Sequence, residues 1–152
     1  MKREVIKILL VDDDEDDVVL IKEFIAEGLK GIKWEIQQAT SVEGALEKIL
    51  AEKYDICLVD YRLGEFDGLS LLQEIKYKGI EVPVVLLTGQ GDEEIAVQAM
   101  KAGVSDYLLK SRLTPELLTS SIRYTVELYK REMLRKQAEE GLRKLSRAVE
   151  QS

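Results

Sequence analysis

Short apolar runs that alternate with amphipathic segments constrain the fold of this chain more than any other feature. The runs occupy residues 6–11, 34–39, 55–60, 82–87 and 106–109, and each precedes a segment with apolar residues at helical spacing. Strands that alternate with helices over short connections form a parallel sheet with helices on both faces. The first, third and fourth runs are the most apolar, which places them inside the sheet. The sequence therefore predicts a doubly wound, flavodoxin-like α/β fold with five parallel strands in the order 2-1-3-4-5.

Polar residues and proline at the starts of three helices agree with this division of the chain. Thr40 and Glu43 have the spacing of a capping box, in which side chains satisfy free backbone N–H groups. Asp92 is expected to cap the fourth helix. Thr114 followed by Pro115 is typical of the start of the last helix.

Composition narrows the chemistry that is open to the chain. Its 152 residues include no histidine, which excludes His-based acid–base catalysis, His metal ligands and a phosphohistidine on this chain. The single cysteine, Cys57, lies inside an apolar run and is expected to be a small buried hydrophobic residue. No apolar run approaches the ~20 residues that cross a bilayer. Residues 1–4 lead into a strand without the layout of a signal peptide, so we expect a cytoplasmic protein with no membrane partner.

The net charge of −7 is unevenly distributed. Residues 1–129 hold 15 basic and 25 acidic residues, whereas residues 130–152 hold seven basic and four acidic ones. Nucleic-acid binding requires Lys and Arg to neutralise phosphates, so the acidic body argues against a nucleic-acid partner. The charges near the C-terminus are mixed in sign, and we interpret them as the solvated face of a helix.

The last helix is longer than the domain requires. Helical composition continues from Pro115 to about Ser152, and only Gly141 interrupts it. One series at 4-3-4 spacing is expected to pack on the sheet: Ile122, Val126, Tyr129 and Met133. A second series in a shifted phase has the spacing of a coiled-coil seam: Leu134, Ala138, Gly141, Leu145 and Ala148. We therefore expect a domain over residues 1–128 and a helical extension over 129–152 that forms a homodimer.

Polar residues stand at the carboxyl ends of four of the predicted strands: Asp12 and Asp13, then Asp60, Thr88 and Lys110. The carboxyl ends of parallel strands share one rim, where ligands of α/β proteins bind. Carboxylates that meet there need a cation or raised pKa values. Oxygen ligands without His or thiolate favour Mg²⁺. Each residue alone has a structural explanation, but their joint occurrence predicts a phosphoryl-transfer site with Asp60 as the covalent acceptor.

Four motifs resemble the receiver domain of two-component response regulators over residues 5–128: Val11-Asp12-Asp13, Leu58-Val59-Asp60 with Gly68 eight residues later, Leu87-Thr88-Gly89, and Asp106-Tyr107-Leu108-Leu109-Lys110. This resemblance implies a phosphorylation-controlled switch in a phosphorelay. The phosphoryl donor would be a phosphohistidine of a histidine kinase or phosphotransfer protein. The product would be an aspartyl phosphate on Asp60, formed stoichiometrically, so that the chain is not an enzyme.

The same resemblance assigns the other site residues. It implies that Asp13, Asp60 and the backbone carbonyl of Arg62 ligate Mg²⁺, with Asp12 acting largely through water. Thr88 and Lys110 would bind the phosphoryl oxygens. The aromatic switch would be Tyr107, which moves inward as Thr88 moves and remodels the face around the fourth helix and fifth strand.

The chain departs from the family pattern at two positions. Gly64 and Ser111 stand where the family commonly has proline. Because a cis bond before a residue other than proline is costly, we expect a trans bond or a rearranged loop after Lys110. Residues 142–152 resemble the lead-in to a PAS sensor domain, which implies an N-terminal receiver of a longer signalling protein.

Two other functions stay open at this point. A haloacid-dehalogenase-like, Mg²⁺-dependent phosphatase also uses a strand-end Asp nucleophile, a Thr and a Lys, and would take Asp12 as nucleophile and Asp14 as acid. That family needs Thr or Val two residues after the acid, where this chain has Asp16, so we favour the switch. A coiled-coil adaptor with an unphosphorylated receiver is the third function, and the intact acidic set argues against it.

Overall fold

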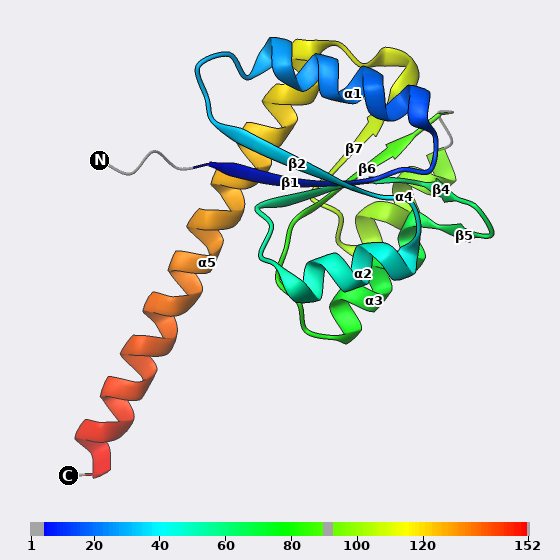
Figure 1. Cartoon of the computed structure of the whole chain (residues 1–152). Helices are drawn as coiled ribbons and strands as arrows, with labels where there is room; N and C mark the ends of the chain where they lie inside the picture. Colours follow the sequence, from blue (N-terminus) through cyan, green and yellow to red (C-terminus); the bar gives the residue numbers. More distant parts are fainter. Residues whose placement is uncertain (1–4, 90–92, 152) are drawn as a thin grey trace.

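The computed structural model describes residues 5–89 and 93–151, which contain the predicted parallel sheet. Its strands are β1 (Ile6–Val11), β2 (Trp34–Ala39), β3 (Ile56–Asp60), β6 (Val84–Thr88) and β7 (Asp106–Leu109). Their order in space is β2-β1-β3-β6-β7, and every neighbouring pair is parallel (Figure 1). The strand order 2-1-3-4-5 predicted from the sequence is confirmed.

Helices cover both faces of this sheet (Figure 1). One face carries α1 (Glu15–Gly28) and α5 (Pro115–Gln151), and the other carries α2 (Val42–Ala51), α3 (Gly68–Tyr77) and α4 (Glu93–Ala102). Each face of the sheet has its own core. Because side chains alternate along a strand, Leu9 and Val11 enter the core under α2, α3 and α4, whereas Ile8 and Leu10 enter the core under α1 and α5. The strands β1, β3 and β6 supply side chains to both cores, which explains their continuous apolar sequence.

Cys57 lies in the core between the sheet and the helices α2 to α4. It is fully buried as a free thiol, and burial raises the pKa of that thiol to about 12. The prediction that Cys57 is a buried hydrophobic residue is confirmed.

Two of the predicted helix starts are described by the structure. Thr114 Oγ1 accepts a hydrogen bond from the backbone N–H of Leu117 at 3.0 Å, so the predicted start of α5 is confirmed. The prediction for α2 was wrong by one residue, because Ser41 rather than Thr40 is the cap and its Oγ accepts from the N–H of Gly44 at 3.0 Å. Asp92 lies outside the described residues.

A short hairpin follows β3 that the sequence pattern did not predict. Its strands are β4 (Arg62–Leu63) and β5 (Phe66–Asp67), which pair antiparallel around a two-residue loop. Gly64 opens that loop with φ +63°, a backbone conformation that proline, with φ near −65°, does not adopt. Gly64, where the family commonly has proline, therefore permits a loop conformation that proline would not allow. Asp67 then caps α3 by accepting from the N–H of Ser70 at 2.9 Å.

The loop after β7 forms one turn of 3-10 helix over Lys110–Arg112. No peptide bond within residues 5–89 and 93–151 is cis, so the expected trans bond between Lys110 and Ser111 is confirmed.

The helix α5 begins in the body and ends outside it (Figure 1). Ile122 and Val126 are buried, whereas Tyr129 and Met133 are half-buried. The side chains of residues 134–151 are all exposed. The start of α5 packs so closely on the end of α1 that a Cβ atom at Gly28 would collide with the side chain of Thr119. Within the described part of the chain, no helix combines the length and the apolar character that crossing a membrane requires.

Candidate functional site

Three carboxylates meet at the carboxyl rim of the sheet. Asp12 follows β1 directly, Asp13 comes next, and Asp60 is the last residue of β3. One carboxylate oxygen from each lies within 4.8 Å of the others. Because β1 and β3 are neighbours in the sheet, their ends bring these residues together. The sequence prediction that the three acidic residues share one rim agrees with this geometry.

Asp12 is the most deeply placed of the three acidic residues. It is completely buried, and its Oδ1 accepts a hydrogen bond from the N–H of Asp14 at 2.9 Å. Burial raises the pKa of Asp12 to about 6, and the nearby charge of Asp60 acts in the same direction. A cation beside Asp12 therefore lowers the free energy of its ionised form.

Asp60 is held in place by its own loop and by Gly68. Its Oδ1 accepts a hydrogen bond from the N–H of Arg62 at 3.3 Å. The N–H of Gly68 donates to the carbonyl oxygen of Tyr61 at 2.6 Å. A Cβ atom at Gly68 would lie 2.6 Å from the carbonyl oxygen of Asp60, so only glycine lets α3 begin this close to the end of β3. Asp60 is buried, with a relative exposure of 7%.

The ammonium group of Lys110 occupies the centre of the acidic rim. Its Nζ lies 3.0 Å from Asp12 Oδ2, 3.0 Å from Asp60 Oδ2 and 2.6 Å from Asp17 Oδ2. Burial lowers the pKa of Lys110, but the hydrogen bonds that its ammonium donates to Asp17, Asp12 and Asp60 outweigh this effect, so that the pKa is raised. The lysine is therefore a charged group, and it compensates the carboxylates in this structure.

Asp17 is a contact of the site that the sequence pattern did not single out. Its position in the first turn of α1 has a sufficient structural explanation, because carboxylates there interact favourably with the helix dipole. No spacing in the sequence relates Asp17 to the strand-end residues, because Asp13 precedes the cap of α1 and only Asp17 lies inside the helix. Only the position of Lys110 in space distinguishes Asp17 from its acidic neighbours.

Thr88 and Tyr107 lie on the two strands next to β3. Thr88 ends β6 and has a relative exposure of 4%, and β6 pairs with β3 so that Leu87 stands beside Asp60. Tyr107 lies in β7 opposite Leu86 and packs against the core under α4. The Tyr107 hydroxyl is buried and has no hydrogen-bond partner among the residues that the structure describes. The structure thus places Thr88 at the rim and Tyr107 two residues below it on the adjacent strand.

The donor set fits a hard divalent cation. Its ligands are carboxylate oxygens from Asp12, Asp13 and Asp60, with neither nitrogen nor sulfur among them. The two buried members already attract one cation, the ammonium of Lys110, at hydrogen-bond distance. A cation site at this rim is therefore compatible with both the geometry and the charge.

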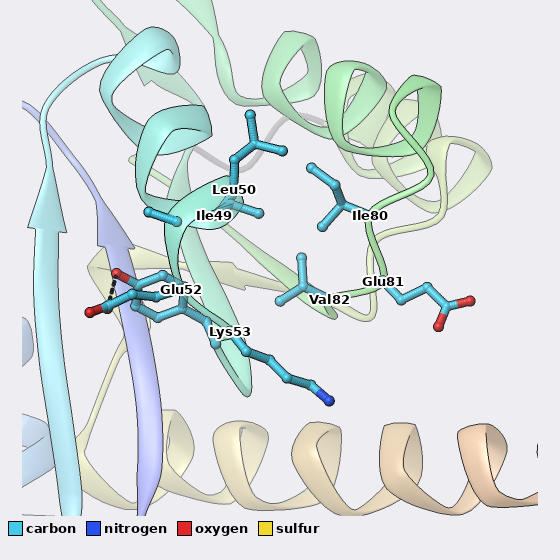
Figure 2. A pocket seen from close by; sticks show the side chains of 9 residues that line it. Ile49, Leu50, Glu52, Lys53, Ile80, Glu81 and Val82 are labelled. Carbon is cyan, nitrogen blue, oxygen red and sulfur yellow. Dashed lines mark hydrogen bonds between the residues drawn. The ribbon is translucent and has the colours of Figure 1, made fainter.

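A separate cavity, drawn in Figure 2, lies near the end of the sheet where β3 and β6 begin. It has a volume of about 300 Å³ and lies between the end of α2 and the segment before β6. Ile49 and Leu50 face Ile80 and Val82 across it, while Glu81 points away from it and Lys53 extends toward α5 (Figure 2). No residue of the acidic rim lines this cavity, so it does not belong to the charged site.

The fold and the rim define the class of protein. A five-stranded parallel sheet with acidic residues after its first and third strands and a lysine after its fifth has the architecture of a receiver domain. Residues 8–123 match the family described as the response regulator receiver domain, which is most of the chain. The chain belongs to the receiver-domain family of response regulators, the phosphoacceptor switches of two-component systems. This match gives no support to the phosphatase alternative.

Relatives of known sequence and structure agree with this assignment. The transcriptional regulatory protein ZraR of Escherichia coli strain K12 is 36% identical over 110 residues, or 72% of this chain. The response regulator protein PilR of Pseudomonas aeruginosa is 38% identical over 104 residues, or 68% of this chain. The chain spans only 24% and 22% of the lengths of these two relatives.

Two solved structures show the same fold. A response regulator receiver domain protein (CheY-like) from Methanospirillum hungatei JF-1 aligns with a TM-score of 0.71 and 26% identity, covering 85% of this chain and 99% of that one. A two-component response regulator from Clostridium difficile aligns with a TM-score of 0.69 and 31% identity, covering 80% of this chain and 96% of that one. The fold predicted from the sequence is therefore that of the family.

Proposed function

We propose that Asp60 of this chain accepts a phosphoryl group from a phosphohistidine of a histidine kinase or phosphotransfer protein. A carboxylate oxygen of Asp60 attacks the phosphorus atom, the O–P bond forms as the N–P bond of the donor breaks, and the imidazole nitrogen leaves with the bonding electron pair. The observation that carries the proposal is the gathering of Asp12, Asp13 and Asp60 at one rim with their oxygens within 4.8 Å. Each transfer modifies the chain once, so it acts as a stoichiometric switch and not as an enzyme.

We assign Asp12, Asp13, Asp60 and the backbone carbonyl of Arg62 to the binding of Mg²⁺. A bound Mg²⁺ ion would neutralise the charge that accumulates on the transferred phosphoryl oxygens. The burial of Asp12 and Asp60 supports the assignment, because it makes the pair of carboxylates depend on a cation.

We assign Lys110 and Thr88 to the oxygens of the phosphoryl group on Asp60. Lys110 Nζ already lies 3.0 Å from Asp60 Oδ2, so an ammonium with three donors stands beside the acceptor atom. Thr88 offers a hydroxyl group at the end of the adjacent strand. Tyr107 is the proposed switch. Its hydroxyl is buried and has no hydrogen-bond partner among the described residues. A movement of the ring that gives this hydroxyl a partner would therefore be favourable.

We also propose that residues 1–128 form the receiver domain and that residues 129–152 are a helical extension that joins a second copy of the chain. Exposed large apolar side chains support this: Leu134, Leu142, Leu145 and Val149. Most helices in proteins owe their stability to the packing of an apolar face, and a partner helix on this stripe would supply that packing. In a longer protein, the extension would connect the receiver to an output domain, for which a PAS domain is one candidate. The acidic body argues against contact between this chain and nucleic acid.

The phosphoacceptor is tested by labelling. The wild-type chain is incubated with Mg²⁺ and a small phosphoramidate donor, and the acyl phosphate is read by intact-protein mass spectrometry. We expect one stable modification on the wild-type chain and none on Asp60→Asn, because the amide cannot serve as the nucleophile. The matched control is Asp16→Asn, an exposed carboxylate in the first turn of α1, which should be labelled like wild type.

Two results would contradict the assignment. Persistent labelling of Asp60→Asn would place the acceptor elsewhere. Release of many equivalents of phosphate without a retained label would indicate the phosphatase. Chelation of Mg²⁺ should reduce the label on the wild-type chain to background.

A further inference from the structure

The shortest ion pair of Lys110 is made with a residue outside the acidic cluster. Lys110 Nζ lies 2.6 Å from Asp17 Oδ2, compared with 3.0 Å for both Asp12 and Asp60. The side chain of Asp17 is 35% exposed and reaches the rim from the first turn of α1, whereas that of Asp12 is fully buried. Lys110 therefore has two partners inside the cluster and one beside it.

These two kinds of partner respond differently to a metal ion. Asp12 and Asp60 are members of the group of three carboxylates that fits a divalent cation, and Asp17 is not. A divalent ion among the three would take up carboxylate oxygens that now pair with the ammonium of Lys110, and its charge would repel that ammonium. Asp17 is the carboxylate partner that Lys110 can keep when a metal ion is bound.

We propose that Asp17 is a positioning residue that keeps Lys110 at the rim and limits its competition with Mg²⁺ for Asp12 and Asp60. This inference rests on the proposed function, in which the lysine must stand beside the acceptor Asp60 while the metal is bound. Without the carboxylate of Asp17, the ammonium pairs only with Asp12 and Asp60 in the metal-free protein. Mg²⁺ displaces the ammonium from these two carboxylates in either case, but without Asp17 the displaced ammonium has no carboxylate partner to keep.

The first test is the affinity for Mg²⁺ itself, measured by isothermal titration calorimetry on the full chain. We expect Asp17→Asn to weaken Mg²⁺ binding about fivefold. Asp17→Glu should restore most of that loss, because it returns the carboxylate. The matched control is Asp16→Asn, which removes the same charge from the same helical turn and which no ion pair connects to Lys110 within the described part of the chain.

A double-mutant cycle separates positioning from the general effect of negative charge. In a Lys110→Ala background there is no ammonium to hold, so Asp17→Asn should change the Mg²⁺ affinity no more than Asp16→Asn does. A second readout is the ¹H–¹⁵N NMR signal of the Lys110 ammonium group in the Mg²⁺-loaded protein. We expect this signal in the wild-type chain and its loss by rapid solvent exchange in Asp17→Asn.

The proposal is overturned if Asp17→Asn and Asp16→Asn weaken Mg²⁺ binding equally. It is also overturned if the effect of Asp17→Asn persists in full without Lys110. If the proposed function is wrong, the result is different, because the wild-type chain then carries no acyl phosphate on Asp60. The calorimetric comparison of Asp17→Asn with Asp16→Asn still decides the role of Asp17 in that case.

Discussion

The two halves of α5 have the same backbone conformation and different reasons for it. In the first half, Leu118, Ile122 and Val126 are buried in the core shared with α1. In the second half, every side chain from residue 134 to residue 151 is exposed. Packing of an apolar face stabilises the first half, as in most protein helices. The second half is stabilised by contacts within the helix itself, such as the ion pairs of Arg135 with Glu132 and Glu139.

This difference divides α5 into a part that packs on the domain and a part that does not. The first half closes one face of the sheet, and its start packs against the end of α1. The second half presents an apolar stripe that no described residue of the chain covers. Substitutions should therefore act on the stability of the domain in the first half and on association in the second.

The exposed apolar residues also distinguish two seams on the second half. The seam predicted from the sequence contains Leu134, Ala138, Gly141, Leu145 and Ala148. A second seam at 4-3 spacing runs along α5 from residue 124 to residue 149: Tyr124, Leu128, Arg131, Arg135, Ala138, Leu142, Leu145 and Val149. This second seam contains more of the large exposed side chains, and its two arginines would help to set the register.

The largest expected effect comes from a matched pair of truncations in the two halves. Ile122→Ala is expected to lower the free energy of unfolding of the monomer by about 3 kcal/mol, because it leaves a cavity in a fully packed core. Leu145→Ala removes an exposed side chain and should change it by about 0.5 kcal/mol or less. Urea unfolding at a concentration where the chain is monomeric measures both. Equal losses would show that the second half packs on the body after all.

A smaller effect separates the two seams. If the second seam is correct, Leu142→Lys is expected to raise the dimer dissociation constant about tenfold, because it puts a charge in place of a buried leucine. Leu134→Lys should then have little effect. Sedimentation velocity over a range of concentrations, with and without a phosphoryl mimic, measures the association. A stronger effect of Leu134→Lys would restore the first seam, and a wild-type monomer at every concentration would exclude the dimer.

The smallest expected effect concerns the one glycine of the extension. Apart from the adjacent backbone of its own helix, no described atom lies within 4 Å of the position where a Cβ of Gly141 would stand, so Gly141→Ala introduces no collision with the rest of the described chain. The change should stabilise the helix locally by about 1 kcal/mol, because glycine loses more backbone entropy than alanine in a helix. Amide hydrogen exchange of residues near position 141 measures it. Unchanged protection would mean that a partner helix already stabilises this segment in the wild-type chain.

The parts of the fold that were predicted correctly have a strong periodic signal. The strands β1, β3 and β6 are buried on both faces and read as continuous apolar runs, and the rules for parallel sheets then order them. The β4–β5 hairpin was missed because strands of two residues have no period to detect. The cap of α2 was misplaced by one residue because Thr40 and Ser41 are both good caps, and only the backbone geometry distinguishes them.

The same distinction applies to the site. The positions of Asp12, Asp13 and Asp60 at one rim follow from the chain order alone, because the carboxyl ends of neighbouring parallel strands must lie together. The role of Asp17 does not follow, since a carboxylate in a first helical turn is ordinary until a lysine from 93 residues away is placed beside it.

By itself, the sequence determined the sheet, its order and the chemical character of the rim, because these depend on periodicity and on the ends of strands. The tertiary structure decided which carboxylate of the acidic run meets Lys110 and which face of α5 stays uncovered. The physical reason is range: backbone pattern is a local property, whereas the pairing of an ammonium with a carboxylate depends on side chains that only folding brings within 3 Å.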